Sequence, residues 1–129
     1  MATINGTSAK NTLTGTSSAD RISGLADRGN GNDYLRGGIG NDLIDGGAGV
    51  DTASWVGASA GANVNLLTGK ALTNKGTDSL VSIENVEGSD LSDTVVGSSA
   101  ANALTGLNGN DTLNGQDGGD RLDGGDGND

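Results

Sequence analysis

Single aliphatic residues recur at intervals of nine within two blocks of the chain, and each follows an acidic or amide residue by two positions. The aliphatic row comprises Leu13, Ile22, Leu35, Ile44, Ala53, Val95, Leu104, Leu113 and Leu122. The polar row comprises Asn11, Asp20, Asp33, Asp42, Asp51, Asp93, Asn102, Asp111, Asp120 and Asp129. Because alternate side chains of a strand point to opposite faces, this pattern predicts three-residue strands that each bury one side chain.

The segments between these strands are rich in glycine and make the unit a nonapeptide. Clear copies are GGIGNDLID from Gly37, GGAGVDTAS from Gly46, GLNGNDTLN from Gly106 and GQDGGDRLD from Gly115. Counting from the first glycine, the acid stands at position six and the aliphatic residue at position eight. Glycine permits a tight turn because it has no Cβ. We therefore predict an all-β fold, a parallel β-roll (a right-handed β-solenoid) in which two units of nine residues complete one coil.

The repeats divide the chain into three parts of one module, residues 1–129. An N-terminal block spans 6–54, with four extra residues at 24–27, and a C-terminal block spans 88–129. The intervening spacer, 55–87, breaks the count of nine and predicts either wider coils or a hairpin side-lobe. Its expected strands lie near 53–56, 62–67, 70–73 and 80–86, with a turn at Thr68 and Gly69. Since the last unit is incomplete, we expect the chain to be a piece of a larger protein.

Composition limits the classes of protein that fit this pattern. The 129 residues include 25 Gly and no Phe, and only 32% are hydrophobic, so the core must be small. The formal net charge of -10 disfavours nucleic acid as a partner and favours cations. A disordered chain is the alternative that this composition leaves open.

Several kinds of chemistry lack their residues. The chain has no Cys and no His, which excludes thiolate zinc sites, HExxH zinc motifs and catalytic triads. We therefore expect a protein that is not an enzyme. No apolar run is long enough to span a bilayer, and we expect no membrane span.

Stacked turns with carboxylates and exposed carbonyl groups suit Ca²⁺, a hard cation that takes six to eight oxygen ligands. Units 18 residues apart share an edge of the roll, which pairs Asp33 with Asp51, Asp111 with both Asp93 and Asp129, and Asn102 with Asp120. We predict several Ca²⁺ ions held by position-six carboxylates and glycine carbonyl groups. The carboxylates are Asp33, Asp42, Asp51, Asp93, Asp111, Asp120 and Asp129. The carbonyl groups are those of Gly29, Gly31, Gly38, Gly40, Gly47, Gly49, Gly109, Gly118, Gly125 and Gly127. Asp20 is a further candidate, and Asn11 and Asn102 either cap a turn or complete a site weakly.

Other polar and aromatic residues have less specific interpretations. Asp45, Asn114 and Asp123 stand at position nine, where side chains point to solvent. Trp55 either packs in the core of the spacer or stacks on a sugar. The basic residues either keep the protein soluble or form a groove for an acidic polysaccharide; they include Arg21, Arg28, Arg36, Lys70, Lys75 and Arg121.

The strings GNGNDYL, GGIGNDLIDGGAGVD and GNDTLNGQDGGDRLDGGDGND resemble the repeats-in-toxin family, also called hemolysin-type calcium-binding repeats. The spacer resembles the segments that separate repeat blocks in this family. The resemblance implies calcium-induced folding and type I export of a larger bacterial protein, hence an extracellular location. It also implies a second possible partner, because such repeats are attached to enzymes that act on polysaccharides such as alginate.

Overall fold

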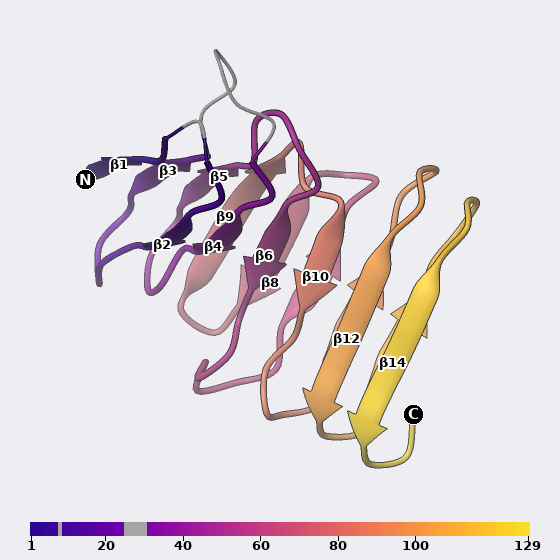
Figure 1. The fold of residues 1–129 in the computed structure, drawn as a ribbon. Coiled ribbons are helices and arrows are strands. Elements are labelled where there is room, and N and C mark those ends of the chain that lie inside the picture. Colours follow the sequence, from indigo (N-terminus) through magenta and orange to yellow (C-terminus); the bar gives the residue numbers. More distant parts are fainter. Residues whose placement is uncertain (8, 25–30) are drawn as a thin grey trace.

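The computed structural model describes residues 1–7, 9–24 and 31–129, which form fourteen strands. The strands belong to two sheets, and the chain passes from one sheet to the other along the solenoid (Figure 1). Sheet A contains, in spatial order, β1 (Thr3–Asn5), β3 (Arg21–Ser23), β5 (Leu43–Asp45), β9 (Gly76–Val81), β8 (Lys70–Thr73), β7 (Asn63–Asn65), β11 (Thr94–Val96) and β13 (Thr112–Asn114). Sheet B contains β14 (Arg121–Asp126), β12 (Ala103–Asn108), β10 (Asn85–Glu87), β6 (Thr52–Ser54), β4 (Tyr34–Arg36) and β2 (Thr12–Thr14). The predicted all-β parallel β-roll is confirmed.

Strand register follows the nonapeptide count. Position-eight residues pair with one another across neighbouring coils at a separation of 18, as in Ile4 with Ile22 and Leu104 with Leu122. In the N-terminal block the separation rises to 22, as in Ile22 with Ile44. This difference equals the four extra residues that the sequence predicts at 24–27, of which 25–27 lie outside the described residues.

The spacer adds three strands to sheet A, namely β7, β8 and β9, and one strand, β10, to sheet B. Strand β9 pairs in parallel with β5, and β7 pairs in parallel with β11. Strand β8 lies between β9 and β7 and is antiparallel to both. In sheet B, by contrast, β6 pairs directly with β10. The spacer strands therefore continue the roll instead of forming a separate lobe, and one coil is widened on one side only.

Most predicted spacer strands are present, but one is wrong. Strand β8 has the predicted bounds, whereas β6 and β7 begin or end within three residues of theirs. The predicted strand at 80–86 is two strands, because β9 ends at Val81 and β10 begins at Asn85. Ser82, with φ of 50°, starts the turn between them. The chain must turn here because β9 belongs to sheet A and β10 to sheet B.

The core is a narrow double row of position-eight side chains between the two sheets. Ile22, Leu35, Ile44, Val95 and Leu104 are fully buried. The core is thinner at the C-terminal coil, where Leu122 is 48% exposed because its strand has a neighbour on one side only. Here β12 and β14 also extend to six residues, longer than the predicted three, because the ladder continues through Leu107 and Gly125.

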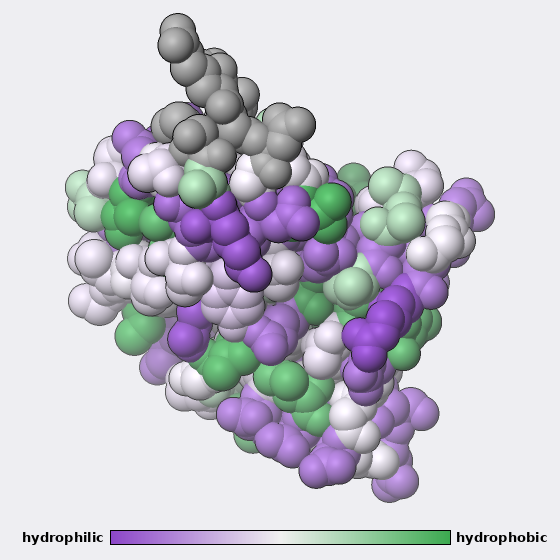
Figure 2. All heavy atoms as spheres, viewed as in Figure 1, coloured by the Kyte–Doolittle hydropathy of each residue, from purple (hydrophilic) through white to green (hydrophobic). Residues whose placement is uncertain are grey.

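The surface is mainly polar. On the face drawn in Figure 2, apolar side chains lie in small groups between hydrophilic ones. No helix long and apolar enough to cross a membrane occurs in the described ranges.

Candidate metal centre

Position-six residues form two rows, one at each edge of the roll. Each residue of row A stacks at the edge where sheet A strands begin; the row contains Asp20, Asp42, Asp78, Asp93, Asp111 and Asp129. Row B precedes the strands of sheet B and contains Asn11, Asp33, Asp51, Glu84, Asn102 and Asp120. In the repeat blocks the rows arise because each six-residue turn ends in an acid or amide at position six, and the spacer contributes Asp78 and Glu84 without such a turn.

Neighbouring members of a row are joined by hydrogen bonds, except that row A is interrupted between Asp78 and Asp93, where β8 and β7 lie between β9 and β11. The main-chain N–H of Asp33 donates to Oδ1 of Asp51 at 2.7 Å, and that of Asp111 donates to Oδ1 of Asp129 at 2.9 Å. Asp93 donates to Asp111 in the same way at 2.7 Å, and Asn102 to Asp120 at 2.9 Å. The structure thus brings together every pair expected from the 18-residue coil. Ligation by these residues stays a prediction.

The second carboxylate oxygen distinguishes the members of a row. Oδ2 of Asp42, Asp51 and Asp111 is buried and has no hydrogen-bond partner. These side chains are at most 3% exposed. A buried carboxylate oxygen without a partner is costly, by several kcal/mol in general. A cation beside it would remove that cost, so these three oxygens are the strongest candidates for metal ligands.

Ser or Thr at position two produces a different turn. Oδ2 of Asp20 accepts hydrogen bonds from the N–H and the hydroxyl of Thr16, at 2.6 and 2.7 Å. Ser89 likewise donates its N–H and its hydroxyl to the carboxylate of Asp93, at 2.6 and 2.9 Å. Ser98 donates to Asn102 in the same positions. In these turns hydrogen-bond donors of the protein satisfy the side-chain oxygen at position six, which a cation would satisfy in the other turns.

The pKa values follow this division. Burial raises the pKa of Asp42 to about 6, with a further contribution from the charge of Asp78. Burial also raises the pKa of Asp51 to about 6, and the charges of Asp33 and Glu84 act in the same direction. In contrast, hydrogen bonds from Ala2 and Thr16 lower the pKa of Asp20.

Burial likewise raises the pKa of Asp111, assisted by the charges of Asp93 and Asp129. A carboxyl group that resists ionisation until a cation arrives is the expected property of a calcium ligand in its metal-free state.

Glycine lets the backbone of each turn approach the next. Gly125 has φ of 94°, and a Cβ there would lie 1.9 Å from the carbonyl oxygen of Leu107 in the neighbouring coil. Positive φ is shared by eight of the predicted ligand glycines: Gly38, Gly40, Gly47, Gly49, Gly109, Gly118, Gly125 and Gly127. Gly31 lacks this conformation, and Gly29 lies outside the described residues. Main-chain carbonyl groups therefore lie between stacked turns, close to the carboxylate rows.

The donor set fits calcium. No group of three or more His, Cys, Asp or Glu side chains comes together in the described part of the chain. An ion between two turns would thus have carboxylates from at most two position-six residues, and backbone carbonyl groups would supply other ligands. Oxygen ligands of mixed origin on a flexible turn suit Ca²⁺ better than Mg²⁺, which needs strict octahedral geometry.

Two members of the rows were not recognised in the sequence, Asp78 and Glu84. Asp78 had a detectable signal, because GTDSLV from Gly76 places an acid two residues before an aliphatic residue. Glu84 has a weaker signal, its place two residues before Val86. Its carboxylate accepts the N–H of Asp51 at 2.8 Å, as the position-six Asp of a neighbouring coil does elsewhere.

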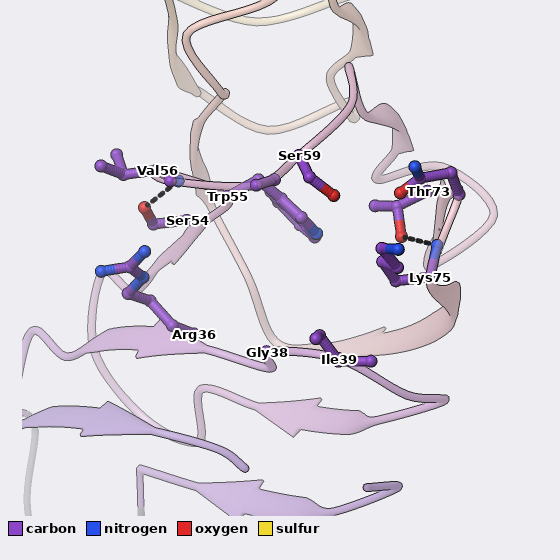
Figure 3. Close-up of a pocket in the computed structure, with 12 residues that line it drawn as sticks. Arg36, Gly38, Ile39, Ser54, Trp55, Val56, Ser59, Thr73 and Lys75 are labelled. Carbon is purple, nitrogen blue, oxygen red and sulfur yellow. Dashed lines mark hydrogen bonds between the residues drawn. The ribbon is translucent and has the colours of Figure 1, made fainter. Parts of the chain in front are cut away.

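A pocket of about 220 Å³ lies between spacer residues and the turn that follows β4 (Figure 3). Trp55, Ile39 and Val56 contribute apolar surface, and Arg36 and Lys75 stand at its sides. Trp55 is only 6% exposed, so it packs in the core of the spacer, which is one of the two interpretations that its sequence position allowed.

Comparison with protein families agrees with this geometry. The model of the RTX calcium-binding nonapeptide repeat matches four times, at residues 3–28, 29–53, 87–120 and 96–129, and leaves residues 1–2 and 54–86 unmatched. No curated protein matches the chain. Repeats of the matched family bind Ca²⁺. The stacked turns, the carboxylate rows and this match over most of the chain identify it as a member of the RTX calcium-binding nonapeptide repeat family.

Proposed function

We propose that this module binds several Ca²⁺ ions between its stacked turns and that binding and folding are one event. The observation that carries the proposal is the set of buried, unpartnered Oδ2 atoms of Asp42, Asp51 and Asp111. The charges of carboxylates in neighbouring coils raise the pKa of all three residues, so the metal-free roll contains repulsion at three places. Calcium would reverse the sign of these interactions.

Calcium binding can offset the small core. A ligand that binds only the folded state contributes RT ln(1 + [L]/Kd), about 2.7 kcal/mol for each site when the ion is at 100 times its dissociation constant. Several sites together would match the whole stability of a typical domain, about 5–15 kcal/mol.

The cellular role follows from the calcium gradient. RTX repeats are typical of secreted bacterial proteins. We propose that the chain stays unfolded at the low free calcium of the cytoplasm, leaves by type I export as part of a larger protein, and folds in calcium-rich surroundings outside. Its role is structural and assists export, and modules of this family are typically non-catalytic.

A circular dichroism titration tests the proposal. Calcium should convert a mostly disordered spectrum into one of β structure, whereas magnesium at the same concentration should have much less effect. A calcium-free protein with the full β spectrum would refute coupled folding, and calorimetry without calcium binding would refute the site.

The pocket supports a second candidate function, binding of an acidic polysaccharide. Arg36 and Lys75 stand beside apolar surface in a protein whose net charge is -10. The ion pair found within the described ranges joins Arg121 and Asp123. No carboxylate of these ranges forms an ion pair with Arg36 or Lys75. Titration with alginate oligomers tests this function separately from calcium binding. The control is the double variant that combines Arg36→Ala with Lys75→Ala.

A further inference from the structure

Residues 73–81 of the spacer, TNKGTDSLV, occupy the place of a repeat unit although they lack its first two glycines. Leu80 pairs with Ile44 as one position-eight residue pairs with another in the repeat blocks. The N–H of Gly46 donates to the carbonyl group of Val81 at 2.9 Å, as that of Gly24 donates to Asp45 at 2.8 Å one coil earlier. The strand of this segment therefore has repeat register.

The turn before this strand also has the repeat geometry. Gly76 stands at position four, and a Cβ there would lie 1.8 Å from the carbonyl oxygen of Gly40. In the regular unit from Gly46, a Cβ at Gly49 would lie 2.2 Å from the carbonyl oxygen of Gly31. Both pairs bring a position-four glycine against the position-four carbonyl group of the preceding coil on the same edge.

Position five shows the same correspondence. The N–H of Thr77 donates to Oδ1 of Asn41 at 2.8 Å, and the N–H of Val50 donates to Oδ1 of Asn32 at 3.0 Å. The tip of the β8–β9 hairpin thus reproduces positions four and five of a calcium-binding turn, although the chain reaches it through an antiparallel strand.

Position six completes the correspondence. The N–H of Asp42 donates to Oδ1 of Asp78 at 3.0 Å, as Asp33 donates to Asp51. Both Asp42 and Asp78 are 3% exposed, and Oδ2 of Asp42 has no partner. The two residues are 36 apart in sequence, twice the usual separation. Two buried carboxylates therefore stand at adjacent position-six places, and one of them has an oxygen without a hydrogen-bond partner.

We propose that Asp42 and Asp78 hold a Ca²⁺ ion between the last regular turn of row A in the N-terminal block and the tip of the spacer hairpin. This inference rests on the proposed function, because it assumes that ions bind between stacked position-six carboxylates. The family match does not include Asp78, since its copies end at residue 53 and resume at residue 87.

The site would fasten the spacer to the repeat block at one edge only. At the opposite edge, only Ser82, Ile83 and Glu84 connect β9 to β10, so a six-residue turn is absent there. Asp51 instead donates its N–H to the longer side chain of Glu84. Ordering of the hairpin would thus depend on calcium at row A, because row B passes from Asp51 to Glu84 without a six-residue turn between β9 and β10.

The single Trp of the chain provides a selective readout. Trp55 follows the end of β6 and shares a pocket with Thr73 and Lys75 of the hairpin, and its side chain interacts with Asp78. Asp51 lies at the start of β6, at the other edge. Tb³⁺ replaces Ca²⁺ at oxygen sites and emits when a nearby indole transfers energy to it. Excitation at the red edge of the Trp band avoids the single Tyr.

We would load the full chain with Tb³⁺ and compare Asp78→Asn with Asp45→Asn. Asn keeps the size of the side chain and an acceptor oxygen but removes the charge. Asp45 stands at position nine of the adjacent strand β5, so it tests diffuse attraction of the cation. Asp78→Asn should abolish Trp-sensitised emission and lower the calorimetric Ca²⁺ count by one, whereas Asp45→Asn should keep both.

Unchanged emission and an unchanged ion count in Asp78→Asn would overturn the site while leaving calcium binding by the repeats intact. Folded wild-type protein that binds Tb³⁺ without Trp-sensitised emission would also overturn it, however the variants fold. If the wild-type chain binds neither ion, the proposed function fails, and this inference fails with it.

Discussion

The main-chain N–H of Asp93 donates a 2.7 Å hydrogen bond to Oδ1 of Asp111, its counterpart one coil later. Asp111 in turn donates its N–H to Asp129, and its own Oδ2 has no partner. Asp111 therefore belongs to two successive turn interfaces at once, and its carboxylate is positioned to serve both.

Asp111→Ala should damage two neighbouring calcium sites, while Asp123→Ala should have little effect. At calcium 100 times above the dissociation constant, each lost site removes about 2.7 kcal/mol of stabilisation. Asp123 carries the same charge but is an exposed position-nine residue paired with Arg121. Calcium affinity and the folding midpoint would be measured at two ionic strengths. Equal losses in both variants, abolished equally by salt, would indicate diffuse attraction instead of coordination.

The calcium-free protein should become more stable as the pH falls from about 7 to about 4. The folded-state pKa values of Asp42 and Asp51 are about 6, above the ordinary value of 3.8. The folded state then binds more protons than the unfolded state, so this stabilisation is complete below the unfolded pKa and disappears as the pH rises through about 6. Circular dichroism in chelator across this range would measure it.

The combined variant Asp42→Asn with Asp51→Asn is the control for this pH dependence. It removes the two groups whose pKa rises to about 6 and should make the profile shallower, with Asp78 and Asp111 contributing what remains. At saturating calcium the dependence should reverse, because the ion binds ionised carboxylates. Calcium-free stability that rises with pH through 6 would contradict the prediction.

Gln116→Gly should stabilise the calcium-bound protein. Gln116 stands at position two with φ of 70°, a conformation that glycine adopts at the same position in Gly38, Gly47 and Gly125. A left-handed conformation costs a residue with a Cβ about 1–2 kcal/mol, and glycine loses about 0.5–1 kcal/mol through unfolded-state entropy. We expect a net gain of about 0.5–1 kcal/mol in urea denaturation.

Gly125→Ala is the opposite change at the same position of the next unit. Its φ is 94°, and the new Cβ would lie 1.9 Å from the Leu107 carbonyl oxygen. This variant should lose more than about 2 kcal/mol, since strain and a backbone clash act together. A stabilised Gly125→Ala would mean that position two does not need the left-handed conformation.

The period of nine was sufficient to predict the roll, the aliphatic row and the pairs of position-six residues. It was sufficient because identical turns repeat identical geometry, so a separation of 18 residues always becomes adjacency. The four-residue interruption was also visible, and it appears as the 22-residue separation of Ile22 and Ile44.

The partners of Asp42 could not be predicted in this way. Asp20 is 22 residues before it and Asp78 is 36 residues after it, and each separation depends on how an irregular segment folds. The side chains of the antiparallel strand β8 alternate between two faces as in any strand. Its local sequence therefore does not show that β9 pairs with β5. The contacts of Thr16 and Ser89 were missed for another reason, since position two was considered only as a place for glycine.

Ser89→Ala should destabilise the folded protein more at subsaturating calcium than at saturating calcium. The Ser89 hydroxyl is buried and donates to Oδ1 of Asp93 at 2.9 Å, so its removal takes a donor from a buried carboxylate. Such a loss costs about 1–3 kcal/mol. Calcium can replace the missing donor, so the loss should shrink when the ion is bound, and the calcium needed for half-maximal folding should rise.

Ser99→Ala is the matched control, because Ser99 is an exposed residue of the next turn. Hydrogen exchange of the Thr94–Val96 strand at subsaturating and at saturating calcium would measure both variants. An equal loss in the two states would show that the hydroxyl and the ion do not act on the same carboxylate.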